Sequence, residues 1–414
     1  MRIKSISARE IIDSRGNPTV EATVLAENGA IGISSSPSGA SRGIHEAFEL
    51  RDGGPRFGGR GVLKAVKNIN EAINNALSGM DLSPQEDVDA RMMALDGTKN
   101  KEKLGGNAIV SVSMANLKAA AHASGMELYE FMGGETIPIP QLNIINGGKH
   151  AGNGLSVQEF MVIPAKAKSF AEGMRGACEV YANLRERLTR KYGRGARNVG
   201  DEGGFAPPMN RSEEALDAIS ESVEECGYSK EIGIGIDAAA SSFYRAKDGK
   251  YFMDGNYLER EELIDYYGEL LKKYRMLSIE DPFFEEDYES YAEFTLRYGS
   301  KVQVVGDDLV VTNPERLEKA IETRAMNALL LKVNQIGTVT EARKAAQMAI
   351  EAGMQVVVSH RSGETEDTFI ADFAVGIGAT QIKAGAPCRS ERVAKYNRLM
   401  HIEQKAAGRY AKVW

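Results

Sequence analysis

The sequence predicts an α/β protein: an irregular (β/α)8 barrel of the TIM type with an antiparallel first strand pair, preceded by a smaller α+β N-terminal domain. Short apolar runs follow one another after residue 136, and each closes on a polar residue. From the third run onward these ends are Asp237, Glu280, Asp307, Lys332, His360 and Lys383. The later ends lie roughly 25 residues apart, which suits a strand, a helix and two loops in each unit.

Eight runs are long and apolar enough to be strands, which is the number that closes such a barrel. They are IPIPQLNIIN, VQEFMVIPA, IGIGID, RMLSIED, VQVVGDD, ALLLKVNQ, QVVVSH and ATQIKAG. Only the short link NGGKHAGNGL joins the first two runs. A parallel crossover needs a dozen or more residues, so we expect this first pair to be antiparallel and the barrel to be irregular at its start.

The first part of the chain has a different pattern of strand and helix signals. TVEATVLAEN and AIGISSS are strand-like and meet near Asn28-Gly29, a strong hairpin signal. Helical spacing follows from Gly61 to Leu77 and again in the Ala-rich NAIVSVSMANLKAAAHASG. The extended IPIP segment at 137–140 marks a boundary. We therefore expect an N-terminal domain over 1–136 and a catalytic barrel over 137–414. Within the barrel, Asn313-Pro314 predicts a helix start and Gly353 a helix end.

Composition narrows the class of protein. The chain has 414 residues, which favours two domains. It has no apolar run long enough to span a membrane and no signal-peptide pattern at its start. The three cysteines are far apart and never form a CxxC pair, which favours a reducing cytoplasm over a zinc site or disulfide framework. The net charge of −7 argues against a general nucleic-acid binder.

Three strand ends carry carboxylates: Asp237, Glu280 and Asp307. Residues at the C-terminal ends of barrel strands converge on one face. Carboxylates brought together in this way repel each other unless a cation lies among them. Oxygen ligands without His or Cys favour magnesium over zinc. The alternative is that each carboxylate merely caps the helix or turn that follows it.

Two further strands, ALLLK and ATQIK, end in Lys332 and Lys383. Desolvation favours the neutral form of a lysine, although nearby carboxylates oppose it. A lysine of this kind can act as a general base. The alternative is a pair of solvated lysines at the edge of the sheet.

Three loops could complete a site. SHRSGETED at 359–367 contains His360, Arg361 and Ser362 before an acidic helix start, which suits a phosphate but is also compatible with an ordinary turn. PSGASRGIHE at 37–46 lacks the ending of a Walker motif, and its Ser and Gly content suits a mobile lid. NVGDEGGFAPP places Asp201 and Glu202 among glycines, where they could be reactive or could simply cap a turn.

At these residues the sequence strongly resembles the enolase family, and the resemblance covers essentially the whole chain. It runs from DSRGNPTVE at 13–21 to KAGAPCRSERVAKYN at 383–397. Between them, in the family's order, come PSGAS, NGGKHAGN, QEFM, GDEGG, SIEDPF, GDDLVVTNP, LLLKVNQIGT, SHRSGETED and IKAGAP. The family's activity is the magnesium-dependent, reversible dehydration of 2-phospho-D-glycerate to phosphoenolpyruvate in glycolysis and gluconeogenesis.

The resemblance implies two magnesium ions in each active site. Asp237, Glu280 and Asp307 would hold the first ion, which also binds the substrate carboxylate. Ser41, in the lid, would help to bind a second ion that bridges the carboxylate and the phosphate.

The resemblance also implies roles in proton transfer. Lys332 would remove the C2 proton, and Glu202, supported by Glu159, would assist departure of the C3 hydroxyl group. Lys383 would neutralise the charge that develops, as expected for a site that acts electrostatically. His360 belongs to the same catalytic set. The substrate would be contacted by His150, Glu159, Glu280, Asp307, Lys332, Ser359, His360, Arg361, Ser362 and Lys383.

Some positions depart from the family's usual pattern. Arg42 stands where threonine is typical, and we expect it to face solvent and to change the lid modestly. Ser34, Ser35 and Ser36 replace a more apolar stretch, which predicts a looser anchor for the lid.

A further departure concerns assembly, since the resemblance implies a homodimer or a higher homo-oligomer. His401 stands where family dimers often have an arginine that pairs with the equivalent of Glu21, while Arg9 and Glu391 are both retained. One ion pair of the interface would then be weaker and dependent on pH.

Two other functions are open to a chain of this kind. One is an enzyme of the same superfamily that acts on an unphosphorylated acid, and the SHRSGETED and PSGAS segments argue against it. The other is a surface or scaffold protein whose catalysis is dispensable. Such a protein would have no need of Lys332 or Glu202, and both are present.

Overall fold

The computed structural model describes residues 1–414 except 40–42, 44 and 407. It begins with an antiparallel sheet whose strands lie in the order β1 (Ile3–Ile12), β2 (Pro18–Ala26) and β3 (Ile31–Ser35). The turn between β2 and β3 lies at the Asn-Gly pair, where Gly29 has a φ of 87°. The predicted hairpin is therefore confirmed.

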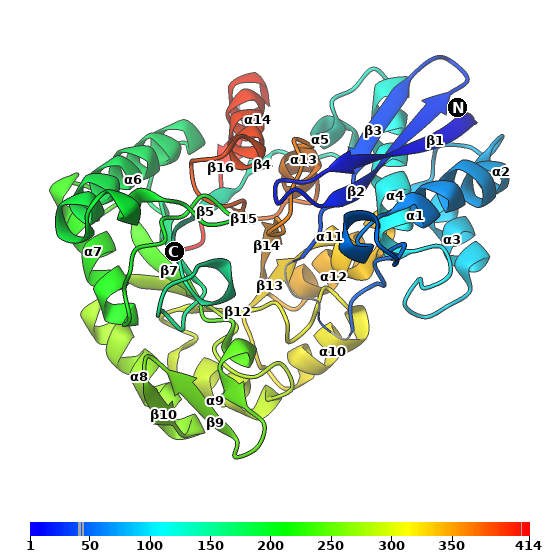
Figure 1. The fold of residues 1–414 in the computed structure, drawn as a ribbon. Helices are drawn as coiled ribbons and strands as arrows, with labels where there is room; N and C mark the ends of the chain where they lie inside the picture. The colour runs from blue at the N-terminus through cyan, green and yellow to red at the C-terminus, as the bar shows by residue number, and fades with distance from the viewer. Residues whose placement is uncertain (40–42, 44, 407) are drawn as a thin grey trace.

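Helices cover one face of this sheet (Figure 1). They are η1 (Arg56–Gly59), α1 (Leu63–Asn68), the π-helix η2 (Ile69–Ile73), α2 (Asn74–Leu77), α3 (Gln85–Asp96), α4 (Gly106–Ala123) and α5 (Leu128–Phe131). Helix α4 packs against β2 and β3. A Cβ atom added at Gly32 would lie 2.0 Å from the carbonyl oxygen of Ala115. Only glycine therefore allows α4 to approach the sheet this closely.

The rest of the chain forms a closed eight-stranded barrel, which confirms the predicted fold class (Figure 1). All eight predicted runs supply a strand. The strands are β5 (Ile139–Asn146), β6 (Glu159–Ile163), β7 (Gly233–Asp237), β11 (Met276–Glu280), β12 (Gln303–Gly306), β13 (Ala328–Leu331), β14 (Gln355–Ser359) and β15 (Gln381–Lys383).

Strand β6 runs against both of its neighbours, whereas the other neighbouring strands of the barrel pair in parallel. The antiparallel pairing of β5 with β6 was predicted, and β6 also pairs antiparallel with β7. In that second ladder Glu159, the first residue of β6, lies opposite Asp237, the last residue of β7. The start of β6 therefore lies at the same face of the barrel as the ends of the other strands.

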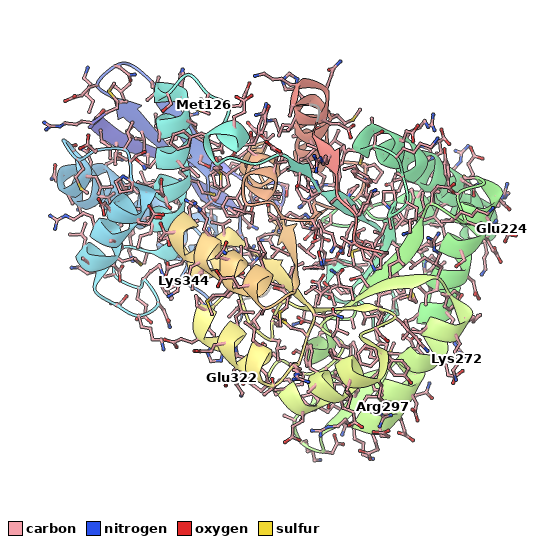
Figure 2. The ribbon with its side chains drawn as sticks, turned by 180° about the vertical axis from the view of Figure 1, so that it is seen from behind. Met126, Glu224, Lys272, Arg297, Glu322 and Lys344 are labelled. Atoms are coloured by element: carbon pink, nitrogen blue, oxygen red, sulfur yellow. The ribbon has the colours of Figure 1, made fainter. Side chains whose placement is uncertain are left out.

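Helices surround the barrel. They are α6 (Phe170–Tyr192), α7 (Ser212–Glu225), α8 (Arg260–Lys273), α9 (Tyr288–Tyr298), α10 (Pro314–Glu322), α11 (Val333–Ile336), α12 (Val339–Glu351), α13 (Phe369–Gly376) and α14 (Ser390–Ala406). Figure 2 shows charged side chains on their outer faces, among them Glu224, Lys272, Arg297, Glu322 and Lys344. The predicted helix signals are confirmed, because Asn313 caps α10 through the amide of Glu315 and Gly353 follows α12 with a φ of 77°.

Smaller elements complete the fold. Strands β8 (Tyr244–Arg245), β9 (Lys250–Met253) and β10 (Asn256–Leu258) form a separate sheet after β7, and β4 (Thr136–Ile137) pairs with β16 (Arg409–Tyr410). Short 3-10 helices are η3 (Gly148–His150), η4 (Arg194–Arg197) and η5 (Ala240–Ser242). All three cysteines are free. In the part of the chain that the structure describes, we find no helix with both the length and the apolar character needed to cross a membrane.

Buried carboxylates join the N-terminal elements to the barrel. Asp367, just before α13, accepts hydrogen bonds from Ser34, from the Ser35 amide at 2.9 Å and from Lys118 of α4 at 2.5 Å. Asp89 of α3 accepts from the amide of Thr340, in the first turn of α12, at 3.0 Å. We expected the serines to loosen this region, but Ser34 and Ser35 are buried donors to a carboxylate of the barrel.

Candidate active site

The strand ends meet in one cavity of about 250 Å³ at the face of the barrel toward which seven strands point. Most of the predicted site residues line it. They are His150, Glu159, Glu202, Asp237, Asp307, Lys332, Ser359, His360, Arg361, Ser362 and Lys383. Glu280 does not line the cavity, because it lies beneath the ammonium group of Lys383, which contacts it. Ser41 and Arg42, for which the sequence predicted roles, lie outside the described residues.

Lys383 is the centre of a buried ion cluster. Its Nζ lies 2.8 Å from Glu280 Oε2 and 3.1 Å from both Asp237 Oδ2 and Glu159 Oε2. Burial alone would lower the pKa of Lys383, but the surrounding carboxylates raise it well above its ordinary value. Lys383 is therefore a fixed cation at the floor of the cavity.

Lys332 contacts a single carboxylate, and its Nζ lies 2.5 Å from Asp307 Oδ2. Burial would lower the pKa of Lys332, but Asp307 outweighs burial and the pKa is raised. Both partners are held by further hydrogen bonds, since the backbone amide of Lys332 donates to Thr312 Oγ1 and the side-chain amide of Gln335 donates to Asp307 Oδ1, each at 2.9 Å. The ammonium group is thus aimed into the cavity from the end of β13.

The predicted metal ligands fit a hard cation by their chemistry. Asp237, Glu280 and Asp307 are all buried and offer only oxygen atoms, as magnesium prefers. Burial and the neighbouring Asp237 raise the pKa of Glu280 well above its ordinary value, so Glu280 resists ionisation unless further positive charge is placed beside it.

A second group of carboxylates lies beside the first. Asp281, Asp307 and Asp308 bring one oxygen each to within 4.8 Å of one another. Burial and the nearby Asp307 raise the pKa of Asp281 to about 7. Asp281 also accepts hydrogen bonds from the amides of Asp307 and Asp308. It therefore shapes the backbone that carries Asp307.

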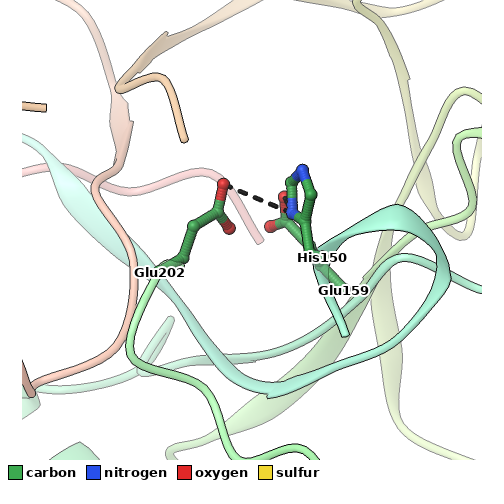
Figure 3. Close-up of side chains that lie close together, drawn as sticks. All are labelled: His150, Glu159 and Glu202. Atoms are coloured by element: carbon green, nitrogen blue, oxygen red, sulfur yellow. Dashed lines mark ion pairs between the residues drawn. The ribbon is translucent and has the colours of Figure 1, made fainter. Parts of the chain in front are cut away.

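His150 lies close to two glutamates, and Figure 3 shows its ion pair with Glu202 and its position beside Glu159. Its Nδ1 is 3.4 Å from Glu202 Oε1 and 3.7 Å from Glu159 Oε1. Glu159 comes from the reversed strand β6, and Glu202 comes from the loop between η4 and α7. Asn143 of β5 donates to Glu202 Oε2 at 2.9 Å and orients the carboxylate.

These three groups have opposed protonation tendencies. Burial and the adjacent Glu202 raise the pKa of Glu159 to about 8. Burial would also raise the pKa of Glu202, but His150 and His360 outweigh it and hold the pKa well below its usual range. Burial would lower the pKa of His150, but the two glutamates raise it to about 9. Two neighbouring carboxyl groups whose pKa values differ in this way are typical of acid–base sites.

The loop after β14 supplies a second cationic region. Arg361 is buried and pairs with Glu46 of the N-terminal part, with Nη1 2.9 Å from Oε2 and Nη2 3.3 Å from Oε1. Arg15, from the turn between β1 and β2, donates to Ser362 Oγ at 3.2 Å. The N-terminal elements therefore wall this side of the cavity with charged side chains.

Sequence reasoning missed several residues of the site. Glu46 lies within the quoted PSGASRGIHE segment, and Asp281 and Asp308 are the second acids of the IED and GDD strand ends. The two aspartates could have been identified from the sequence, because each belongs to a pair of adjacent acidic residues at the end of a predicted strand. Nothing in the sequence distinguished Glu46, because its partner lies 315 residues away.

A barrel whose strand ends hold buried lysines among carboxylates is typical of a barrel enzyme. Comparison with known proteins identifies the family. The family model described as "Enolase, N-terminal domain" matches residues 3–132, and "Enolase, C-terminal TIM barrel domain" matches residues 134–412. The chain therefore belongs to the enolase family, whose members are lyases.

Comparison with individual enolases leads to the same family. The enolase of Methanocaldococcus jannaschii is 55% identical over 406 residues, covering 97% of this chain and 95% of the relative. The enolase of Methanopyrus kandleri is 54% identical over 412 residues, covering 98% and 96%. Enolase B of Dictyostelium discoideum is 52% identical over 422 residues, covering 98% and 95%. The similarity thus extends over nearly the full length of both chains.

Proposed function

We propose that this protein catalyses the reversible dehydration of 2-phospho-D-glycerate to phosphoenolpyruvate, with magnesium, as a step of glycolysis and gluconeogenesis. One observation carries the proposal: a single cavity brings together the Lys332 and Lys383 clusters, the Glu159–Glu202 pair and the Arg361 loop. This set matches the needs of the reaction, which must remove a proton, release a hydroxyl group and bind a phosphate.

In this mechanism Lys332, as the free amine, takes the proton from C2 of the substrate. The electron pair left on C2 spreads into the carboxylate and makes it a dianion, which Lys383 faces as a fixed cation at the floor of the cavity. A lysine base acting beside magnesium is an established arrangement in enolase-superfamily sites.

The second half of the reaction breaks the bond between C3 and its hydroxyl oxygen. The electron pair on C2 forms the new double bond, and the leaving oxygen takes a proton through Glu202, so that water departs. Because His150 and His360 hold the pKa of Glu202 low, Glu202 must first take up that proton from a neighbour. Glu159 and His150 are the nearest protonated groups from which Glu202 would recover that proton. His360, Ser359, Arg361 and Ser362 would bind the substrate from the loop after β14.

Two magnesium ions are part of this proposal. Asp237, Glu280 and Asp307 would hold the first, and Ser41 would contribute to the second. When bound, the ions supply positive charge next to the substrate carboxylate and phosphate.

The test follows phosphoenolpyruvate by absorbance, with and without EDTA. We expect activity on 2-phosphoglycerate that EDTA removes and magnesium restores. Lys332→Ala should lower kcat by about 10²–10⁴-fold, as expected for loss of a general base, while magnesium binding persists. Lys344→Ala, an exposed lysine of α12, is the matched control and should behave like the wild type. Turnover of an unphosphorylated sugar acid but not of 2-phosphoglycerate would instead favour the superfamily alternative.

We further propose a homodimer, or a higher homo-oligomer, in the cytoplasm. Arg9 pairs with Glu21 within its own chain at 2.6 Å and is 73% exposed, which leaves it accessible for the pairing with Glu391 of a second copy that the resemblance to the family implies. Light scattering after size exclusion would measure the mass, and a monomer at micromolar concentration would contradict the proposal. We keep the boundary between residues 136 and 137 as the proposed division into an N-terminal domain and a catalytic barrel.

A further inference from the structure

Arg392 is a fully buried arginine in α14 and lies behind the active site. Its guanidinium donates to four acceptors in two loops that border the cavity. It contacts His360 Nδ1 at 2.5 Å, the carbonyl oxygens of Arg361 and Ser362 at 2.6 Å each, and that of Asp201 at 3.1 Å. One side chain thus ties the loop that carries Glu202 to the loop that carries His360.

The contact with His360 determines which ring nitrogen holds a proton. An arginine side chain has five N–H donors and no acceptor, so the imidazole nitrogen that faces it must accept. Nδ1 of His360 therefore lacks a proton, and the proton of the neutral ring is on Nε2. That nitrogen points into the site, 3.6 Å from Glu202 Oε1.

The surroundings of His360 agree with a neutral ring. Burial lowers the pKa of His360 well below its ordinary value. Glu202 acts in the opposite direction, whereas Arg392, Lys383 and Lys332 add to the lowering. Among the charged groups of the described chain that act most strongly on the ring, Glu202 is the one that favours protonation, and it lies on the Nε2 side.

We propose that Arg392 is a positioning residue, which holds His360 as the tautomer with its proton on Nε2 and so aims the single ring N–H at Glu202 and the substrate. The proposal rests on the roles proposed above for His360 and Glu202. It also gives a role to a cation at a fully buried position of α14. Arg392 orients the group that touches the substrate without touching the substrate itself.

The same helix offers a matched control. Lys395, three residues further on, is also fully buried and also holds the loop after β14, since its Nζ lies 2.9 Å from Glu364 Oε2 and donates to the carbonyl oxygen of Thr365 at 2.6 Å. Within the described residues, the Lys395 ammonium group contacts Glu364 and the carbonyl oxygens of Thr365 and Glu391, and not His360. Replacing Lys395 therefore disturbs the loop to a similar degree but leaves the acceptor nitrogen of His360 paired with Arg392.

The test reads the tautomer directly by NMR of protein labelled with ¹⁵N in its histidine rings. The chain has five histidines, and the His360 signals are the ones that disappear in His360→Gln. We expect wild-type His360 to be protonated on Nε2 alone, from mildly acidic to mildly alkaline pH. Arg392→Met should give a mixture of tautomers or a ring that titrates, whereas Arg392→Lys and Lys395→Met should keep the wild-type form.

Activity gives the second readout. Arg392→Met should lower kcat by about 10- to 100-fold, as for other residues that orient a reacting group, and Arg392→Lys should recover part of the loss. A wild-type His360 protonated on Nδ1 would overturn the proposal, even if Arg392→Met does not fold. So would an equal change of tautomer in Lys395→Met. The tautomer is measured without substrate, so a wild type that fails to dehydrate 2-phosphoglycerate would refute the proposed function separately.

Discussion

Asp367→Asn tests how the N-terminal elements are held against the barrel. The carboxylate of Asp367 accepts from Ser34 and the Ser35 amide on Oδ2, and from Lys118 and the Phe369 amide on Oδ1. Only 10% of the side chain is exposed. An asparagine keeps the shape but replaces one oxygen with an NH₂ group, which then faces two donors.

The expected cost follows from this geometry. Either orientation of the asparagine leaves two of the four donors without an acceptor, and in both orientations Lys118 loses the carboxylate that balances its charge. An unsatisfied buried donor costs about 1–3 kcal/mol, so the free energy of unfolding should fall by about 3 kcal/mol. The change should appear as a lower urea midpoint, because two segments that are distant in sequence lose their shared anchor.

The effect should also depend on pH in a defined direction. Burial would raise the pKa of Asp367, but Lys118 and the serine donors outweigh it, and the pKa lies below the ordinary value of 3.8. A lowered pKa in the folded state stabilises the protein above the unfolded-state pKa, and this contribution is lost as the pH falls through the folded-state value. The difference between wild type and variant should therefore be constant from neutral pH to about 3.8 and should shrink below it.

Two comparisons make the result decisive. Asp248→Asn removes a more exposed carboxylate that pairs with Arg245, and such pairs typically contribute only about 0–1 kcal/mol. Adding Lys118→Met to Asp367→Asn should recover part of the loss, because the unpaired ammonium is then removed. A variant at Asp367 that is no less stable than the Asp248→Asn control at neutral pH would refute the reasoning.

Other substitutions test separate features. Gly32→Ala should cost about 1–3 kcal/mol or more, measured by urea unfolding, because the added methyl group meets the carbonyl oxygen of Ala115 at 2.0 Å; unchanged stability would contradict the close packing. Asp89→Ala should cost about 1–3 kcal/mol in the same assay, since the partly buried amide and hydroxyl of Thr340 lose their acceptor. Magnesium at about 100 times its Kd should add about 2.7 kcal/mol of stability, and Glu280→Gln should reduce that gain; equal gains in both proteins would exclude Glu280 as a ligand.

Part of this site can be predicted from sequence because the barrel repeats. A strand and its helix occupy a nearly constant length, so the residues that close successive strands can be recognised and placed on one face. Asp237, Glu280, Asp307, Lys332 and Lys383 were found in this way. Their pairing was not, because which lysine meets which carboxylate depends on side-chain length and barrel geometry rather than on spacing.

Other parts have no local signal. Arg392 lies in SERVAKYN, where it resembles any charged residue of an exposed helix, and only tertiary packing buries it. Glu46 reaches Arg361 from another part of the chain. Nothing near Ser34 and Ser35 in the sequence indicates that they anchor a loop, because the carboxylate that accepts their hydrogen bonds, Asp367, is more than 300 residues away. Contacts of this range are decided by the fold as a whole.

Because β6 runs in the reversed direction, the chain passes between the two ends of the barrel more often here than in a regular unit. Along β6 the chain descends, so α6 must climb and α7 must descend again before β7 can rise; a regular unit needs only one helix for this return. The extra traverse places the connection between α6 and α7, which carries Glu202, at the upper rim. A single reversal in direction thus delivers both Glu159 and Glu202 to the same place. Shortening that helical hairpin would therefore remove an acid from the site without altering any strand.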